Sequence, residues 1–160
     1  MIKKIINYFF SFHSYGDKIY SLYRKSHKFC KSDSKYNRCM IDYYNYKMYK
    51  KYNCTISGYA NIDSKLTLPH PMSIVIGGVY GKKTTKIGNN VTIYQNVTIG
   101  QKEAKYPIIG NNVIIYAGAK IIGDVHIGNN VIIGANAVVI RDVPDNCVVA
   151  GVPAKVIKKN

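Results

Sequence analysis

The hydrophobic residues between Ile109 and Val143 recur with a period of six. Large aliphatic side chains hold one position of the repeat, and smaller ones hold a second position four residues later. The first series is Ile109, Ile115, Ile121, Ile127, Ile133 and Val139, and the second is Val113, Ala119, Val125, Val131, Ala137 and Val143. Neither the 3.6-residue period of an α-helix nor the alternation of an isolated strand explains this spacing. A six-residue repeat predicts a parallel β-helix.

Each repeat is expected to supply one short strand and one corner, so that three repeats make one coil. Gly, Asn and Asp tolerate the backbone conformations of tight corners. The triplet Gly-Asn-Asn therefore predicts corners at 88–90, 110–112 and 128–130. The register continues toward the N-terminus, with less regularity before residue 87, through Ile93/Val97, Ile87/Val91, Ile74/Gly78, Leu68/Met72, Ile62/Leu66 and Ile56/Ala60. We predict one solenoid over residues 54–146.

Two interruptions of the repeat predict loops that leave the solenoid wall, at 77–86 and 101–107. Loops on a rigid scaffold often carry function. Lys82 and Lys83 in the first loop are candidate acceptor or phosphate contacts, although loop lysines are more often simply solvated.

Residues 1–53 have a helical pattern instead. Asp17 is a candidate N-cap of a helix that carries Ile19, Leu22, Tyr23 and His27 on one face. A second helix is expected over 35–51, with its inward face formed by Tyr36, Met40, Tyr43, Tyr44 and Met48. We predict a helical cap over the first coil, as the terminal units of repeat proteins require. The domains are then a helical region at 1–53 and a β-helix domain at 54–160.

The composition fits one compact unit, because 47% of the 160 residues are hydrophobic. The formal net charge is +15, and residues 1–54 hold twelve of the 23 basic side chains against three of the eight acidic ones. This charge leaves a membrane-surface contact of the basic helices open as an alternative to a purely structural cap. No nucleic-acid-binding motif accompanies it, so nucleic acid is not an expected partner.

The four cysteines have neither metal-site nor redox-pair spacing, which favours a reducing cytoplasmic location. The first twelve residues have the pattern of neither a signal peptide nor a membrane span. A β-helical zinc site would need three converging histidines, which His70 and His126 cannot supply. We therefore expect no metal.

Four motifs in one order resemble the serine acetyltransferase branch of the hexapeptide-repeat acyltransferases: LPHPMSIVIG at 68–77, NVTIG at 96–100, YAGAKIIG at 116–123 and AGVPAK at 150–155. The resemblance covers about residues 54–160. It implies a mainly β protein with a left-handed parallel β-helix behind a short helical cap, assembled as a homotrimer. It also implies that acetyl-CoA lies between neighbouring protomers and donates its acetyl group to a hydroxyl acceptor.

His70 matches the catalytic histidine of this family, and the prolines on both sides restrict its backbone. A neutral imidazole can accept the proton of an attacking hydroxyl, and an unperturbed histidine has a pKa of ~6.5. The other histidine in the repeats, His126, occupies an ordinary outward position.

The resemblance also implies a path for acetyl-CoA along Gly100, Ala117, Gly118 and Ala135, with Lys155 at the charged nucleotide end. Each of the small residues has a structural explanation within the coil as well. Tyr106 either stacks on the acceptor or fills the crevice between protomers.

The sequence departs from serine acetyltransferases where those enzymes carry two aspartates and a second histidine: these places hold Pro69, Thr55 and Tyr106. Without carboxylates to hold the ammonium group of serine, the pattern resembles relatives that acetylate surface polysaccharides. We therefore expect an O-acetyltransferase acting on a saccharide or a saccharide precursor. The alternatives are a serine O-acetyltransferase of cysteine biosynthesis and a catalytically silent trimeric scaffold.

Overall fold

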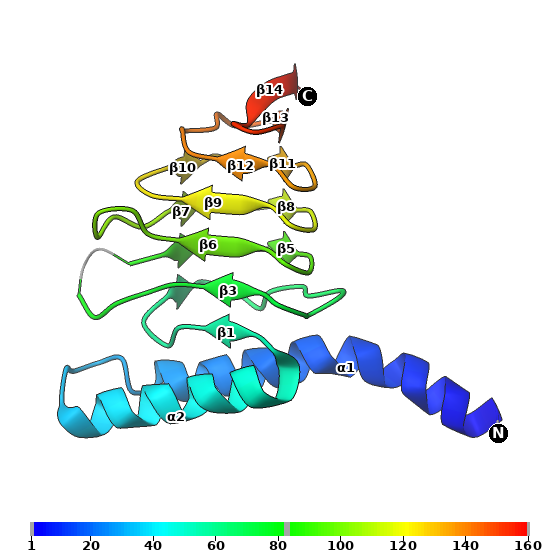
Figure 1. Cartoon of the computed structure of the whole chain (residues 1–160), viewed down its shortest axis with the longest axis vertical. Helices are drawn as coiled ribbons and strands as arrows, with labels where there is room; N and C mark the ends of the chain where they lie inside the picture. The colour runs from blue at the N-terminus through cyan, green and yellow to red at the C-terminus, as the bar shows by residue number, and fades with distance from the viewer. Residues whose placement is uncertain (1, 82–83, 160) are drawn as a thin grey trace.

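The computed structural model describes residues 2–81 and 84–159, with side chains from residue 15 onward, so Lys82 and Lys83 lie outside it. Two helices precede fourteen short strands (Figure 1). The helices are α1 (Ile2–His27) and α2 (Lys35–Tyr52). The strands are β1 (Thr55–Ile56), β2 (Asn61–Ile62), β3 (Val75–Ile76), β4 (Lys86–Ile87), β5 (Thr92–Ile93), β6 (Thr98–Gly100), β7 (Ile108–Ile109), β8 (Ile114–Ile115), β9 (Lys120–Ile122), β10 (His126–Ile127), β11 (Ile132–Ile133), β12 (Val138–Val139), β13 (Cys147–Ala150) and β14 (Lys155–Lys159).

The strands form three sheets that make the walls of a prism. Their orders are β1-β3-β6-β9-β12, β2-β4-β7-β10 and β5-β8-β11-β13-β14, and all pairs except β13 with β14 are parallel. In Figure 1 the near strands run leftward while the chain climbs toward the C-terminus and returns along the far walls, which is a left-handed coil. The predicted β-helix with a helical region before it is confirmed.

The core of the prism consists of the two hydrophobic series. Every member of both series is at most 5% exposed. Strands of only two or three residues suffice because each one places a single large aliphatic side chain inward. The predicted register places Met72 inward and is wrong there, because Met72 is 52% exposed. The chain between β2 and β3 leaves the regular coil at this point.

Asparagines form a ladder along one corner of the prism. Asn90, Asn112 and Asn130 all have a positive φ of 56°, the left-handed conformation that the Gly-Asn-Asn triplets predict. The side-chain amide of Asn90 donates to Asn112 at 3.0 Å, Asn112 donates to Asn130 at 3.0 Å, and Asn130 donates to Asn146 at 2.9 Å. Each coil is thereby tied to the next.

The two helices cover the first coil. Ile19, Tyr23 and Met48 join the core cluster of the prism. The hydroxyl of Tyr23 donates to the carbonyl of Ala60 at 3.0 Å, and Nδ1 of His27 lies 2.8 Å from the carbonyl oxygen of Gly58.

Two details of the helices differ from expectation. Helix α1 begins at Ile2 and runs through Asp17, so that residue is not an N-cap. The inward face predicted for α2 is correct at Met48 and wrong at Tyr36 and Tyr43, which are 65% and 45% exposed. The pattern was ambiguous because α2 is rich in tyrosine and is buried on a narrow stripe only.

The C-terminal segment covers all three walls of the last coil. β14 pairs with β13. Backbone bonds join Val138 of β12 to Gly151 and Ala154, at 3.0 and 2.8 Å. The backbone amide of Val143 bonds the carbonyl of His126 in β10 at 2.9 Å.

Candidate active site

His70 lies in the irregular segment between β2 and β3, at the corner that precedes β3. The neighbours of His70 are anchored while its own side chain is exposed. Leu68 and Pro71 are buried, and the thiol of Cys54 donates to the carbonyl of Pro71 at 3.3 Å. The backbone amide of Asn96 donates to the carbonyl of Met72 at 2.9 Å. A rigid loop therefore presents a solvent-accessible imidazole.

The imidazole of His70 is in contact with an aromatic column that the sequence analysis missed. Its centroid is 6.2 Å from that of Tyr94, and Tyr94 stacks on Tyr116 with centroids 5.2 Å apart. Among the described side chains, no carboxylate forms an ion pair or hydrogen bond with His70. The signal that would have revealed the column is the equivalent place of Tyr94 and Tyr116 in successive coils, each directly before a corner.

Three of the candidate acetyl-CoA residues lie in the coils above His70, at the same corner of the prism. The backbone amide of Gly118 donates to the carbonyl of Gln95, and that of Asn136 donates to the carbonyl of Ala117, both at 2.9 Å. This bonding stacks Ala135 over Ala117. Gly118 has a φ of +75°, and a Cβ there would collide with the side-chain oxygen of Asn136. The glycine thus has a structural reason besides any ligand contact.

Gly100 and Tyr106 lie at the opposite edge of the same wall. Gly100 ends β6, the strand that begins at the His70 corner. Tyr106 is 8% exposed, and a Cβ on Gly77 would lie 3.4 Å from its ring. Burial raises the pKa of its hydroxyl. Within this chain, Tyr106 therefore packs against the wall and lies away from the His70 corner.

Lys155 begins β14 and is exposed near the end of the prism. His126 is exposed in β10, with its Nδ1 3.9 Å from a carboxylate oxygen of Asp142. Across residues 2–81 and 84–159, no cluster of His, Cys, Asp and Glu is suited to a metal ion. No helix of the described chain is long and apolar enough to cross a membrane.

A groove of about 850 Å³ lies behind the His70 loop. Pro71, Met72, Ser73 and Asn96 line one side of it. The other side is formed by the helical region, through Tyr15, Tyr46, Tyr49, Lys50, Lys51, Tyr52 and Asn53. The amide of Asn53 donates to the hydroxyl of Ser73 at 2.8 Å, which fixes the end of α2 to this loop. The end of α2 was not among the predicted site residues.

Comparison with known proteins shows what this chain is similar to. Residues 106–141 match the family described as bacterial transferase hexapeptide (six repeats). Serine acetyltransferase of Staphylococcus xylosus is 44% identical over 105 residues, which are 63% of this chain and 46% of that protein. The chain spans about half the length of the relatives it matches.

Solved structures of serine acetyltransferases are similar to this chain in fold as well. Serine acetyltransferase of Brucella abortus strain S19 in complex with coenzyme A has a TM-score of 0.81 at 30% identity, over 91% of this chain and 57% of that one. Serine acetyltransferase of Neisseria gonorrhoeae in complex with serine has a TM-score of 0.78 at 31% identity, over 90% and 57%.

The expectation of a saccharide acceptor, and of a role in polysaccharide biosynthesis, is wrong. The relatives and the structural neighbours are serine acetyltransferases, which was the alternative. Pro69 and Thr55 stand where those enzymes carry carboxylates, but the similarity extends over the whole β-helix and outweighs these two differences.

The chain has hexapeptide repeats and folds as a left-handed β-helix. The relatives that it matches are serine acetyltransferases. The chain therefore carries hexapeptide repeats of this family at residues 106–141 and is similar in sequence and fold to serine acetyltransferases.

Proposed function

We propose that this protein is an acetyl-CoA-dependent serine O-acetyltransferase with His70 as its general base. The observation that carries the proposal is the similarity of the β-helix to serine acetyltransferases, whose solved structures include complexes with coenzyme A and with serine. The anchored loop that exposes His70 supports its role as the base. The four free cysteines are consistent with a reducing cytoplasm.

In the proposed reaction, a neutral nitrogen of His70 accepts the hydroxyl proton of serine while the serine oxygen attacks the acetyl carbonyl carbon. The tetrahedral intermediate then collapses, and its carbon–sulfur bond breaks. The departing thiolate takes the proton from the imidazolium, which returns His70 to its neutral form. The products are O-acetylserine and CoA, and no further reactant is needed. A general base of this kind accelerates such a reaction by about 10²–10⁴-fold.

The acetyl donor is proposed to lie along the corner formed by Ala117, Gly118 and Ala135. Small side chains there let an extended pantetheine chain approach the backbone. Lys155, with Lys158 and Lys159 on the same strand, carries positive charge for the phosphates of the nucleotide end.

The site is proposed to be completed across protomers of a homotrimer. Gly100 and Tyr106 lie at one edge of a wall, and His70 lies at the other. Contact between the walls of two neighbours would bring the Gly100 and Tyr106 edge of one chain to the His70 corner of the next. In this arrangement Tyr106 contributes to the serine pocket.

The test is release of the free CoA thiol from acetyl-CoA in the presence of serine, compared between wild type and His70→Ala. We expect turnover in wild type and a loss of about 10²–10⁴-fold in kcat for the variant. His126→Ala is the matched control and keeps full activity.

Two results would contradict the proposal. Turnover that is unchanged in His70→Ala would remove the histidine from the mechanism. Absence of both turnover and acetyl-CoA binding in a protein that assembles as a trimer would favour the silent scaffold instead.

A further inference from the structure

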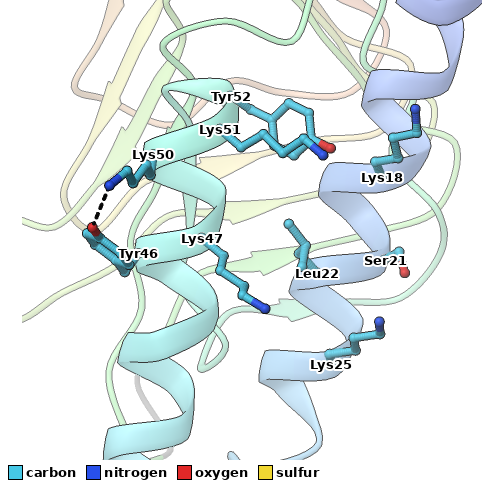
Figure 2. Close-up of a pocket in the computed structure, with 9 residues that line it drawn as sticks. All are labelled: Lys18, Ser21, Leu22, Lys25, Tyr46, Lys47, Lys50, Lys51 and Tyr52. Atoms are coloured by element: carbon cyan, nitrogen blue, oxygen red, sulfur yellow. Dashed lines mark hydrogen bonds between the residues drawn. The ribbon is translucent and has the colours of Figure 1, made fainter.

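A second hollow lies between α1 and α2, with a volume of about 580 Å³ (Figure 2). We call it the helix groove. It is lined by Lys18, Ser21, Leu22 and Lys25 of α1 and by Tyr46, Lys47, Lys50, Lys51 and Tyr52 of α2. None of the candidate acetyl-CoA residues lines it. Its volume falls in the range of sites for small molecules, ~300–1,000 Å³.

The charge of the helix groove is of one sign. Five of its nine lining residues are lysines, and none is Asp or Glu. In the described part of the chain, none of these five lysines forms an ion pair with a carboxylate. Asp17 pairs with Lys65 at 2.6 Å and Asp33 with Arg38 at 3.7 Å, so neither partner is a groove lysine.

Tyrosine rings hold several of these lysines without neutralising them. Nζ of Lys47 lies 4.5 Å from the ring centroid of Tyr43, and Nζ of Lys51 lies 5.5 Å from that of Tyr52. Nζ of Lys50 donates to the hydroxyl of Tyr46 at 3.3 Å. Figure 2 shows Lys47 and Lys51 extending from α2 toward α1, while Leu22 points from α1 toward α2. The groove thus combines cations from both helices with an apolar surface.

We propose that the helix groove binds a soluble, multiply phosphorylated anion. Five like charges around one hollow repel one another, and a polyanion bound among them replaces this repulsion with attraction. Lysine binds phosphate well as a point charge. The cations come from two helices around a hollow rather than from one flat face. This shape suits a molecule that enters the groove better than it suits a bilayer surface.

The experiment is calorimetric titration of the full chain with inorganic tripolyphosphate, at low and at physiological ionic strength. The groove variant is Lys25→Ala/Lys47→Ala/Lys51→Ala. The control variant is Lys28→Ala/Lys31→Ala/Lys35→Ala, which removes the same charge from the helical region outside the groove. A second arm measures sedimentation with vesicles of phosphatidylglycerol and phosphatidylcholine. Neither arm depends on acetyl transfer, so its outcome is separate from that of the proposed enzyme function.

We expect saturable binding of tripolyphosphate that weakens as salt rises. The groove variant should bind at least tenfold more weakly and the control less than twofold more weakly, while Lys25→Arg/Lys47→Arg/Lys51→Arg retains binding. No binding by wild type, or an equal loss in both alanine variants, would overturn the proposal. Binding to anionic vesicles without binding to tripolyphosphate would also overturn it and would make the helices a membrane-surface element.

Discussion

The ring of Tyr94 lies beside the imidazole of His70, with centroids 6.2 Å apart and planes at 46°. Tyr94 is held in turn by Tyr116, whose ring stacks on it at 26°. Ring pairs at such separations contribute ~0.5–1.5 kcal/mol beyond their buried area. No described carboxylate pairs with His70, and this column restricts the orientation of its ring.

Replacing Tyr94 should therefore affect catalysis through the orientation of His70. We expect Tyr94→Ala to lower kcat for acetyl transfer to serine by about two- to tenfold, the equivalent of the ring contact. The KM for acetyl-CoA should change little. Tyr94→Phe keeps the ring and should keep kcat. An equal loss in the two variants would mean that the hydroxyl matters rather than the ring, and no loss in Tyr94→Ala would remove Tyr94 from the site.

Placing a carboxylate before His70 should improve the reaction with serine. Pro69 occupies the position at which serine acetyltransferases carry an aspartate. Pro69→Asp should lower the KM for serine or raise kcat, by about tenfold in kcat/KM, because the carboxylate favours the imidazolium that forms in the reaction. Pro69→Asn is the matched control, since it changes the backbone in the same way without the charge. Steady-state rates over a range of serine concentrations decide the question, and an equal response of Asp and Asn would contradict the charge argument.

The asparagine ladder makes a separable contribution to stability. Asn112→Ala loses both ladder hydrogen bonds. It also replaces asparagine, which tolerates a φ near +56°, with alanine, which tolerates it poorly. We expect the free energy of unfolding to fall by about 1–2 kcal/mol for the backbone conformation, plus a contribution from the lost hydrogen bonds. Asn112→Gly adopts this φ without strain and loses only the ladder hydrogen bonds, so its free energy of unfolding should fall less than that of Asn112→Ala. Urea unfolding at one fixed protein concentration measures both, and equal losses would show that the conformation carries no cost.

The buried hydroxyl of Tyr23 should make stability depend on pH in the alkaline range. Burial raises the pKa of Tyr23 above its ordinary value of ~10. The unfolded chain therefore loses this proton at a lower pH than the folded chain does. The stability that this group contributes is complete below pH ~10 and is lost as pH rises toward the folded pKa.

Tyr23→Phe isolates this effect from the other tyrosines. At neutral pH the variant should unfold with about 1 kcal/mol less free energy, because the carbonyl of Ala60 loses its donor. Above pH ~10 the difference between wild type and variant should shrink, since only wild type carries the titrating group. Urea unfolding of both proteins at neutral and alkaline pH provides the comparison. A difference that stays constant with pH would contradict the assignment.

The regular part of the fold follows directly from the repeat. Ile115 and Val131 are buried because every repeat points its large and its small hydrophobic position inward. Asn112 adopts a positive φ, as the recurring Gly-Asn-Asn triplet predicts. These predictions rest on a period that many residues share, so one substitution does not disturb them.

The irregular segments could not be predicted in the same way. Met72 departs from the register because the segment around His70 is anchored by the carbonyl of Pro71 and by Asn96, which are contacts between distant parts of the chain. The role of His70 was predicted from a family resemblance and not from the repeat. Its ring partner Tyr94 lies in the next coil, so no local pattern around His70 predicts the contact. The helix groove depends on how α1 and α2 pack, and no pattern within either helix specifies that packing.

The covering of the last coil restricts how copies of this protein can associate. A parallel β-helix with open ends would offer unpaired strand edges on which another prism could continue the sheets. Here the backbone bonds of Val143, of Gly151 with Ala154, and of β14 already occupy the edges of the three walls at the C-terminal end, and the helices lie across the first coil. At the C-terminal end of the described chain, β14 is therefore the one edge strand left free of its three walls, and its three lysines place like charges where a second prism would have to continue the sheet.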